Sequence, residues 1–295
     1  MNALVLAVIV ALTNRFGTVS VDTFGARVVS YRPAGGEEAL AKLADGSGGI
    51  QLCWPWFAND GPEGCRRHGV ARYHEFARLA SENDDELRLR LVSDEETRKE
   101  FPYDFRLTLS VRLADCLKLE LVGENTGAVA YDVTEMIHPY LRVGDARQCV
   151  VHGVDGCRYR DNMEPQLGDG RIWRGSYRVG EGSKVFELKT PEGVLRLEDP
   201  ILGRIFGFRF ENSAKAVVWS SGEQNARSAN VTSRLQPGEW RTFVCVENGT
   251  CYRDRAYRLR PGECHVLRRT IGIESPCGSS GCRVQGTWCR VGRPR

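Results

Sequence analysis

The chain has 295 residues, of which 41% are hydrophobic and 27% are charged, an ordinary balance for a soluble globular protein. Its formal net charge is only +3, which argues against a nucleic-acid or membrane partner. Residues 274–295 alone carry this charge of +3, because they contain four arginines and one glutamate. The rest of the chain is therefore close to neutral.

The eleven cysteines are odd in number and scattered, with no Cys-x-x-Cys pair. This usage predicts reduced thiols and a cytoplasmic protein. Four cysteines in apolar surroundings are interpreted as small core residues: Cys53, Cys116, Cys149 and Cys245. Three more lie near the C-terminus without the fourth ligand that zinc needs, so no metal site is expected: Cys277, Cys282 and Cys289.

The first segment of interest is the apolar run 4–12, which is too short to span a membrane. No Lys or Arg precedes it, as a secretory signal would require. We interpret it as a first, buried strand, with a secretory signal as the alternative.

The dominant hydrophobic period after that is two, which predicts strands with one buried face and one wet face. Short helices are expected only at 37–44 and 94–100. Because strands never alternate with long helices, the pattern predicts an all-β protein and not a doubly wound α/β fold. It also predicts one domain, 3–273, followed by a disordered basic tail, 274–295. The expected strands are 87–91, 105–113, 117–121, 194–197, 205–210, 216–219, 242–246 and 265–273.

An aromatic stretch, GGIQLCWPWF at 48–57, contains Trp54 and Trp56 beside a proline. Such residues either form an aromatic wall for the apolar face of a sugar ring or belong to the core. His68 and Arg72 follow in HGVAR. His68 alone is more often structural, whereas Arg72 either binds an anion such as phosphate or makes a surface ion pair.

Two later residues are candidates for acid–base chemistry. His138 follows a strand-like run and has the intrinsic pKa range of an acid–base catalyst, although a hydrogen-bonded core histidine is the alternative. Glu247 ends an apolar strand, where a buried carboxylate is costly unless it is paired or used. Its alternative is a carboxylate that has already turned into solvent.

Ten segments together resemble the aldose 1-epimerase superfamily, and within it the hexose-6-phosphate mutarotase (glucose-6-phosphate 1-epimerase) branch. The resemblance covers residues 15–273 in the family's order. The segments are FGARVVSYRPAGGE (24–37), GGIQLCWPWF (48–57), HGVAR (68–72), FPYDFRLTLSV (101–111), NTG (125–127), HPYLRVGD (138–145), VDGCRYRDN (154–162), VVWSS (217–221), FVCVE (243–247) and LRPGECH (259–265).

The resemblance implies a large two-sheet antiparallel β-sandwich of the galactose mutarotase type, a supersandwich with a sugar cleft on one face. It implies no cofactor, with His138 and Glu247 as the catalytic pair and Arg67, Arg72 and Asp161 as substrate contacts. His68 and Trp54 join the candidate substrate-binding residues. Glu247 is expected to act as base and a protonated His138 as acid while the sugar ring opens and closes.

The expected substrate is an aldohexose, and specifically a hexose 6-phosphate, whose α and β anomers are interconverted by a monomer. Three positions depart from the family pattern: Ser47 stands where an arginine commonly helps hold the phosphate, Gln51 replaces a proline, and Ser220-Ser221 replaces Asn-Pro. An unphosphorylated aldose 1-epimerase therefore remains an alternative.

Two other functions remain open from the sequence. A non-catalytic carbohydrate-binding protein would need the aromatic wall and Arg72 but not the acid–base pair. A glycoside hydrolase would need two carboxylates on either side of the scissile bond, for which Glu135, Asp161 and Glu247 are available.

Overall fold

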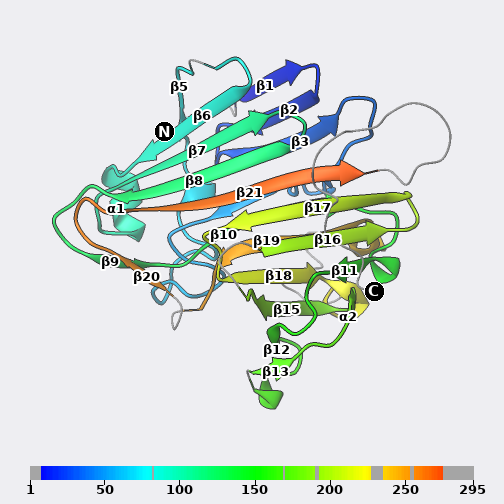
Figure 1. Cartoon of the computed structure of the whole chain (residues 1–295). Coiled ribbons are helices and arrows are strands. Elements are labelled where there is room, and N and C mark those ends of the chain that lie inside the picture. The colour runs from blue at the N-terminus through cyan, green and yellow to red at the C-terminus, as the bar shows by residue number, and fades with distance from the viewer. Residues whose placement is uncertain are drawn as a thin grey trace.

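Two large antiparallel sheets pack face to face in the computed structural model, with a third sheet of two strands beside them (Figure 1). The structure describes residues 8–81, 83–168, 170–189, 193–226, 235–252 and 256–274. Every pairing between the named strands is antiparallel. The fold is therefore the all-β sandwich that the resemblance implies, with the small third sheet as an addition.

The larger sheet has ten strands and carries the residues of chief interest. Its strands in spatial order are β1 (Ile9–Asn14), β2 (Gly17–Asp22), β3 (Arg27–Pro33), β4 (Ile50–Cys53), β10 (Glu135–Arg142), β19 (Phe243–Thr250), β18 (Lys215–Ser220), β15 (Gly182–Glu187), β12 (Arg158–Asp161) and β13 (Arg171–Ile172).

The second sheet has nine strands, most of which run side by side in Figure 1. In spatial order they are β14 (Tyr177–Arg178), β11 (Val150–His152), β16 (Gly193–Asp199), β17 (Arg204–Glu211), β21 (Cys264–Glu274), β8 (Leu117–Asn125), β7 (Phe105–Leu113), β6 (Glu86–Val92) and β5 (Ala77–Leu79).

The remaining elements are short. The two-stranded sheet pairs β20 (Tyr257–Leu259) with β9 (Tyr131–Val133), and the α-helices of the described residues are α1 (Glu95–Glu100) and α2 (Gly222–Ala226). Four 3₁₀ helices span Ala71–Tyr73, Ala146–Gln148, Pro165–Leu167 and Glu239–Thr242. Within the described part of the chain, no helix is both long and apolar enough to cross a membrane.

Alternating side chains build the sandwich, as the period of two predicts. In β7, Phe105, Leu107 and Leu109 are buried and face the other sheet, while Arg112 points into solvent. Each of the eight predicted strands overlaps a strand of the structure. The predicted short helix at 94–100 is confirmed as α1, which a capping box between Asp94 and Thr97 begins.

The expected helix at 37–44 is wrong, because this segment is extended. The Glu38 carboxylate accepts hydrogen bonds from the backbone N–H groups of Tyr31 and Leu40, at 2.9 and 3.0 Å. Leu40 also forms an isolated bridge with Leu141 of β10. A side chain that satisfies backbone donors in this way competes with helix formation.

The first strand also differs from expectation. β1 lies at the edge of its sheet, so Ile9 is 61% exposed and only Leu12 is buried. Residues 1–7 and 275–295, which include most of the predicted tail and its three cysteines, lie outside the described residues. Glu274, the first residue of that tail, is the last residue of β21.

Trp54 belongs to the core between the sheets. Its indole is fully buried and its ring centroid lies 4.6 Å from that of Phe105 and 5.6 Å from that of Phe101. Successive residues of an extended chain point to opposite faces, and the preceding residue, Cys53, packs on the outer face with Met136. The interpretation of Trp54 as part of a sugar-binding wall is therefore wrong.

Because Trp54 fills the core, Trp54→Ala should lower the free energy of unfolding by roughly 3–5 kcal/mol. Urea denaturation followed by circular dichroism measures this loss. Trp219→Ala, which removes a partly exposed tryptophan of β18, is the matched control and should cost clearly less. Equal losses in the two variants would contradict this placement of Trp54.

Candidate active site

His138 and Glu247 meet on neighbouring strands of the ten-stranded sheet. The register of β10 and β19 pairs Ile137 with Asn248 and Tyr140 with Cys245, which puts residues 138 and 247 side by side. The imidazole Nε2 lies 3.4 Å from a carboxylate oxygen of Glu247. Both side chains point away from the inter-sheet core, because the flanking Ile137 and Val246 belong to that core.

Burial decides the electrostatics of this pair, because the side chains are only 7% and 2% exposed. Loss of water raises the pKa of Glu247 to about 8, although Arg72, Arg269 and Arg67 oppose this rise. The same burial, reinforced by Arg72 and Arg67, holds the pKa of His138 well below its usual 6.5. Both neutral forms are therefore favoured in the substrate-free protein.

This distribution differs from the expected protonated His138 beside an ionised Glu247. The physical reason is that the site disfavours charge on either group. The pair nevertheless holds one exchangeable proton, as a donor and an acceptor of protons must. His138 Nδ1 and Glu247 Oε2 have no hydrogen-bond partner among the residues that the structure describes.

The segment 54–72 covers the pair by folding back onto Trp54. The backbone N–H groups of Val70 and Ala71 donate to the Trp54 carbonyl at 2.8 and 3.1 Å. Gly69 has φ +82°, and a Cβ there would lie 2.1 Å from the same carbonyl oxygen. Only glycine permits this approach, which brings the neighbouring His68 to the pair.

His68 joins the site through both its ring and its strained backbone. Its φ is +69°, uncommon for a residue with a side chain, and strain of this kind often marks functional positions. Its ring centroid lies 5.7 Å from that of His138. Its Nδ1 accepts a hydrogen bond from the backbone N–H of Ala58 at 3.2 Å and contacts the Cys53 sulfur at 3.3 Å.

Arg72 and Arg67 supply positive charge to the site. Arg72 is half-buried and donates to the Leu52 carbonyl at 3.2 Å and to the Cys53 sulfur at 2.9 Å. Arg67 is exposed. Both guanidinium groups depress the pKa of His138 and oppose the rise at Glu247, so they lie within electrostatic reach of the pair. Among the described residues, neither makes an ion pair with a carboxylate.

The aromatic residues beside the pair are Tyr140 and Trp219, which sequence reasoning did not select. The Tyr140 ring stacks on His138 at 5.0 Å and 12°, and Trp219 lies edge-on to His138 at 6.3 Å. Both are partly exposed, so their rings are accessible beside the pair. Tyr140 could have been found because it stands two residues after His138 on one strand and so shares its face.

Asp161 lies on the other face of the sheet from the pair. Its cross-strand partners are Lys184, Val218 and Val246 in successive strands, and the last two belong to the inter-sheet core. Lys184 donates a charged hydrogen bond to the Asp161 carboxylate, which also accepts from the Met163 backbone at 3.0 Å. The structure therefore does not bring Asp161 to the pair, contrary to the substrate contact expected from the resemblance.

Arg160, the residue before Asp161, occupies the expected face instead. It is opposite Val185, which is opposite Val217, which is opposite Glu247. Its guanidinium lies 4.7 Å from the ring centroid of Tyr252. The strand register that decides which of these two residues faces the pair could not be predicted from the motif.

A second acid–histidine contact lies within the sandwich. Glu135, at the start of β10, accepts a hydrogen bond at 2.6 Å from His265 of β21 in the opposite sheet. Glu135 faces the interior, since it lies three positions before His138. The three carboxylates considered for a glycosidase, Glu135, Asp161 and Glu247, therefore do not converge on one face.

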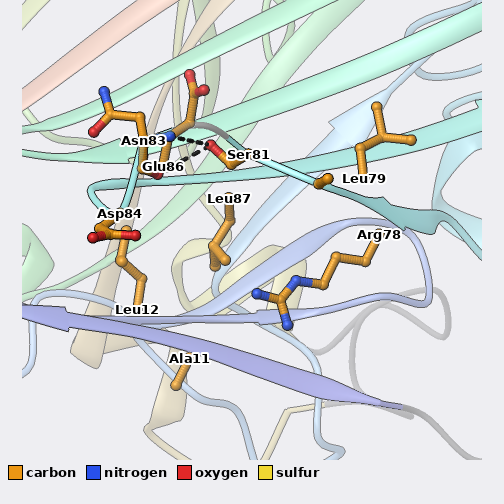
Figure 2. Close-up of a pocket in the computed structure, with 10 residues that line it drawn as sticks. Ala11, Leu12, Arg78, Leu79, Ser81, Asn83, Asp84, Glu86 and Leu87 are labelled. Carbon is orange, nitrogen blue, oxygen red and sulfur yellow. Dashed lines mark hydrogen bonds between the residues drawn. The ribbon is translucent and has the colours of Figure 1, made fainter.

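A cavity of about 450 Å³ lies elsewhere, at the edges of both sheets (Figure 2). Ala11 and Leu12 of β1 form one side, and residues 78–81, 83–84 and 86–87 around the β5–β6 turn form the other. None of the candidate site residues lines it. Within the described ranges, no group of three or more His, Cys, Asp or Glu could hold a metal ion.

The fold and the site together define a β-sandwich protein with a buried acid–base pair on the outer face of one sheet. The sequence matches the family model for aldose 1-epimerase over residues 42–271, so the chain belongs to the aldose 1-epimerase family.

Three similar proteins agree with this membership. A relative from Escherichia coli (strain K12), named "Putative glucose-6-phosphate 1-epimerase", is 29% identical, and the match covers 84% of each chain. The relative of the same name from Salmonella typhimurium is 30% identical over 76% of each chain. The crystal structure of a "putative mutarotase" from Salmonella typhimurium superposes with a TM-score of 0.79 at 25% identity, covering 91% of this chain and 90% of that one.

The buried carboxyl makes a prediction about stability. An unfolded glutamate has the ordinary pKa of 4.5, whereas burial raises that of Glu247 to about 8. Between these pH values the unfolded state has released a proton that the folded state keeps, so rising pH favours unfolding. Glu247→Gln should therefore stabilise the protein, by an amount that grows from about pH 4.5 to about pH 8.

Denaturant titrations at a series of pH values measure this difference. Glu63→Gln, which removes an exposed carboxylate of the same loop region, is the control and should parallel the wild type. A constant difference between Glu247→Gln and wild type across this range would contradict the placement of a neutral carboxyl in the folded site.

Proposed function

We propose that this protein interconverts the α and β anomers of an aldohexose, with a hexose 6-phosphate as substrate. The observation that carries the proposal is the 3.4 Å contact between the His138 imidazole and the Glu247 carboxyl in a water-poor site. Membership of the aldose 1-epimerase family supports it.

Anomer interconversion requires a proton to leave the hydroxyl on C1 while another reaches the ring oxygen. The C1–O5 bond then breaks, the C1–C2 bond rotates, and the ring closes on the other face. Both oxygens are bonded to C1, so one compact acid–base pair can reach them together. In the direction of ring opening, Glu247 takes the hydroxyl proton and His138 supplies the proton to the ring oxygen, and the roles reverse on closure.

The single proton of the pair fits this cycle. Substrate oxygens that bind Oε2 of Glu247 and the imidazole supply polar contacts that the described residues do not make with these atoms. The total charge of the pair is the same whether this proton is on the Glu247 carboxyl or on the His138 imidazole. The pair can thus begin the reaction with one group as donor and the other as acceptor in either arrangement.

The cations around the pair favour an anionic substrate. Arg67 and Arg72 are not neutralised by carboxylates of the described residues, and both act electrostatically on the pair. Ser47 cannot supply the charge that an arginine commonly gives the family at that position. We assign phosphate binding to Arg67 and Arg72, with the sugar ring against Tyr140 and Trp219.

The geometry does not favour a glycoside hydrolase. A retaining glycosidase needs two carboxyl groups about 5–5.5 Å apart on either side of the scissile bond. Glu247 faces a histidine at 3.4 Å instead, and Glu135 and Asp161 point to the other side of the sheet. A non-catalytic sugar-binding protein would bind without turnover, which the following experiment detects.

Removing either member of the pair should abolish most of the catalysis. His138→Ala and Glu247→Gln should each lower kcat roughly 10²- to 10⁴-fold, because each removes a proton-transfer group. Polarimetry or exchange NMR on a purified anomer of glucose 6-phosphate gives the rates, and circular dichroism checks the fold. Sugar binding without mutarotation in the wild type, or unchanged rates in both variants, would reject the proposal.

The phosphate assignment predicts a substrate preference. Wild-type protein should anomerise glucose 6-phosphate with a larger kcat/KM than glucose. Arg67→Met and Arg72→Met, each assayed at its own pH optimum because both charges act on the pair, should raise KM for the phosphate ester roughly 10- to 100-fold, the value of a hydrogen bond to a charged group, and should change KM for glucose little. Arg78→Met, beside the remote cavity, is the control. A preference for free glucose would instead indicate an unphosphorylated aldose 1-epimerase.

A further inference from the structure

Arg269 is a buried cation directly behind the proposed catalytic strand. It lies on β21 in the opposite sheet, is 1% exposed, and points into the interior. Its guanidinium donates to the Asn248 side-chain oxygen at 3.0 Å. Asn248 is the residue after Glu247 on β19 and points to the other face of the sheet. Arg269 and the carboxyl of Glu247 therefore lie on opposite sides of one strand.

The surroundings of Arg269 compensate its charge poorly. Its Nε and Nη2 have no hydrogen-bond partner, and none of the described carboxylates makes an ion pair with it. The rings of Phe208 and Phe210 lie 4.7 and 5.1 Å from the guanidinium and supply only cation–π attraction. A buried charge with so few partners is costly for folding. A purely structural tie between the sheets would not need this charge.

Glu247 is the main acidic group that acts on this cation, and it does so when it is ionised. Burial lowers the pKa of Arg269 to about 9, and Glu247 is the strongest influence against that fall. The guanidinium thus remains charged at neutral pH. In the other direction, Arg269 opposes the raised pKa of Glu247 more strongly than Arg67 does.

We infer that Arg269 is a positioning residue whose charge, acting across β19, sets the pH range in which the His138–Glu247 pair holds its single proton. The inference rests on the proposed function, since that proton is the one transferred to and from the sugar. Arg269 touches neither the substrate nor the reacting atoms.

The sign of the effect is the same for both members of the pair. A nearby positive charge stabilises the carboxylate and destabilises the imidazolium, so it lowers both pKa values. Loss of Arg269 should therefore move both limbs of a bell-shaped pH–rate profile to higher pH, whichever group holds the proton. The other titratable or charged groups around the pair, which stay in place, are Arg67, His68 and Arg72 of the covering segment, Cys53 of β4, Tyr140 of β10 and Cys245 of β19.

The test compares Arg269→Met with Arg268→Met in the full chain. Arg268 is the adjacent residue, but it points to solvent, where it pairs with Glu120 and Glu211. The pH profile of kcat/KM for glucose 6-phosphate should move up by roughly one unit in Arg269→Met, the lower end of the effect of a nearby opposite charge. It should stay in place in Arg268→Met. A structural defect alone would lower the rate without moving the profile.

NMR titration of the His138 imidazole gives an independent readout, because its midpoint should rise in Arg269→Met. If methionine prevents folding, Arg269→Gln replaces it, since glutamine can keep the hydrogen bond to Asn248. An unmoved profile or an unmoved His138 midpoint in a folded variant overturns the inference. Failure of the proposed function is distinguishable, because it is seen as absent mutarotation in wild type, and the His138 titration then decides alone.

Discussion

An acid and a base buried against each other on adjacent strands are the constraint on which the rest of this structure depends. Water would stabilise charge on either group, and its exclusion raises the pKa of Glu247 to about 8 and holds the pKa of His138 well below its usual 6.5. Exclusion requires a cover, which the segment 54–72 provides. The two side chains must also be held at a fixed separation, which the register of β10 and β19 provides.

That register has its own steric requirement. Gly249, two residues after Glu247, has φ +155°, and a Cβ there would lie 2.0 Å from the carbonyl oxygen of Glu135. The two strands therefore leave no room for a side chain at this position, just beyond the His138–Glu247 pair. A side chain at this position would push the strands apart, so the geometry of the pair depends on a residue that carries no chemistry.

The hydrophobic pattern was enough to predict eight of the strands and the all-β class, because one buried face requires alternation whatever the partner strand is. The resemblance correctly selected the two residues that meet, His138 and Glu247. The extended segment at 37–44 was missed because the carboxylate of Glu38 satisfies backbone donors that the sequence does not mark.

Facing direction was harder to predict. Trp54 and Asp161 stand in the right motifs, but each lies one residue away from the face of the pair. A shift of one residue reverses the face of a strand, and the register that decides it comes from partners distant in sequence. The same strand register places Tyr140, Trp219 and Arg160 on the face of the His138–Glu247 pair. The sequence motifs could not predict that Arg269 lies near the pair, because Arg269 belongs to the other sheet.

Trp54 has two separate attachments. Its indole fills the hydrophobic centre, while its carbonyl oxygen accepts hydrogen bonds from Val70 and Ala71, at the end of the covering segment. The cover is consequently not an independently hinged flap, since its backbone is hydrogen-bonded to the carbonyl of a fully buried aromatic residue. In the proposed function, a sugar therefore enters by side-chain rearrangement of Arg67, His68 and Arg72, while the main chain beneath them keeps its place.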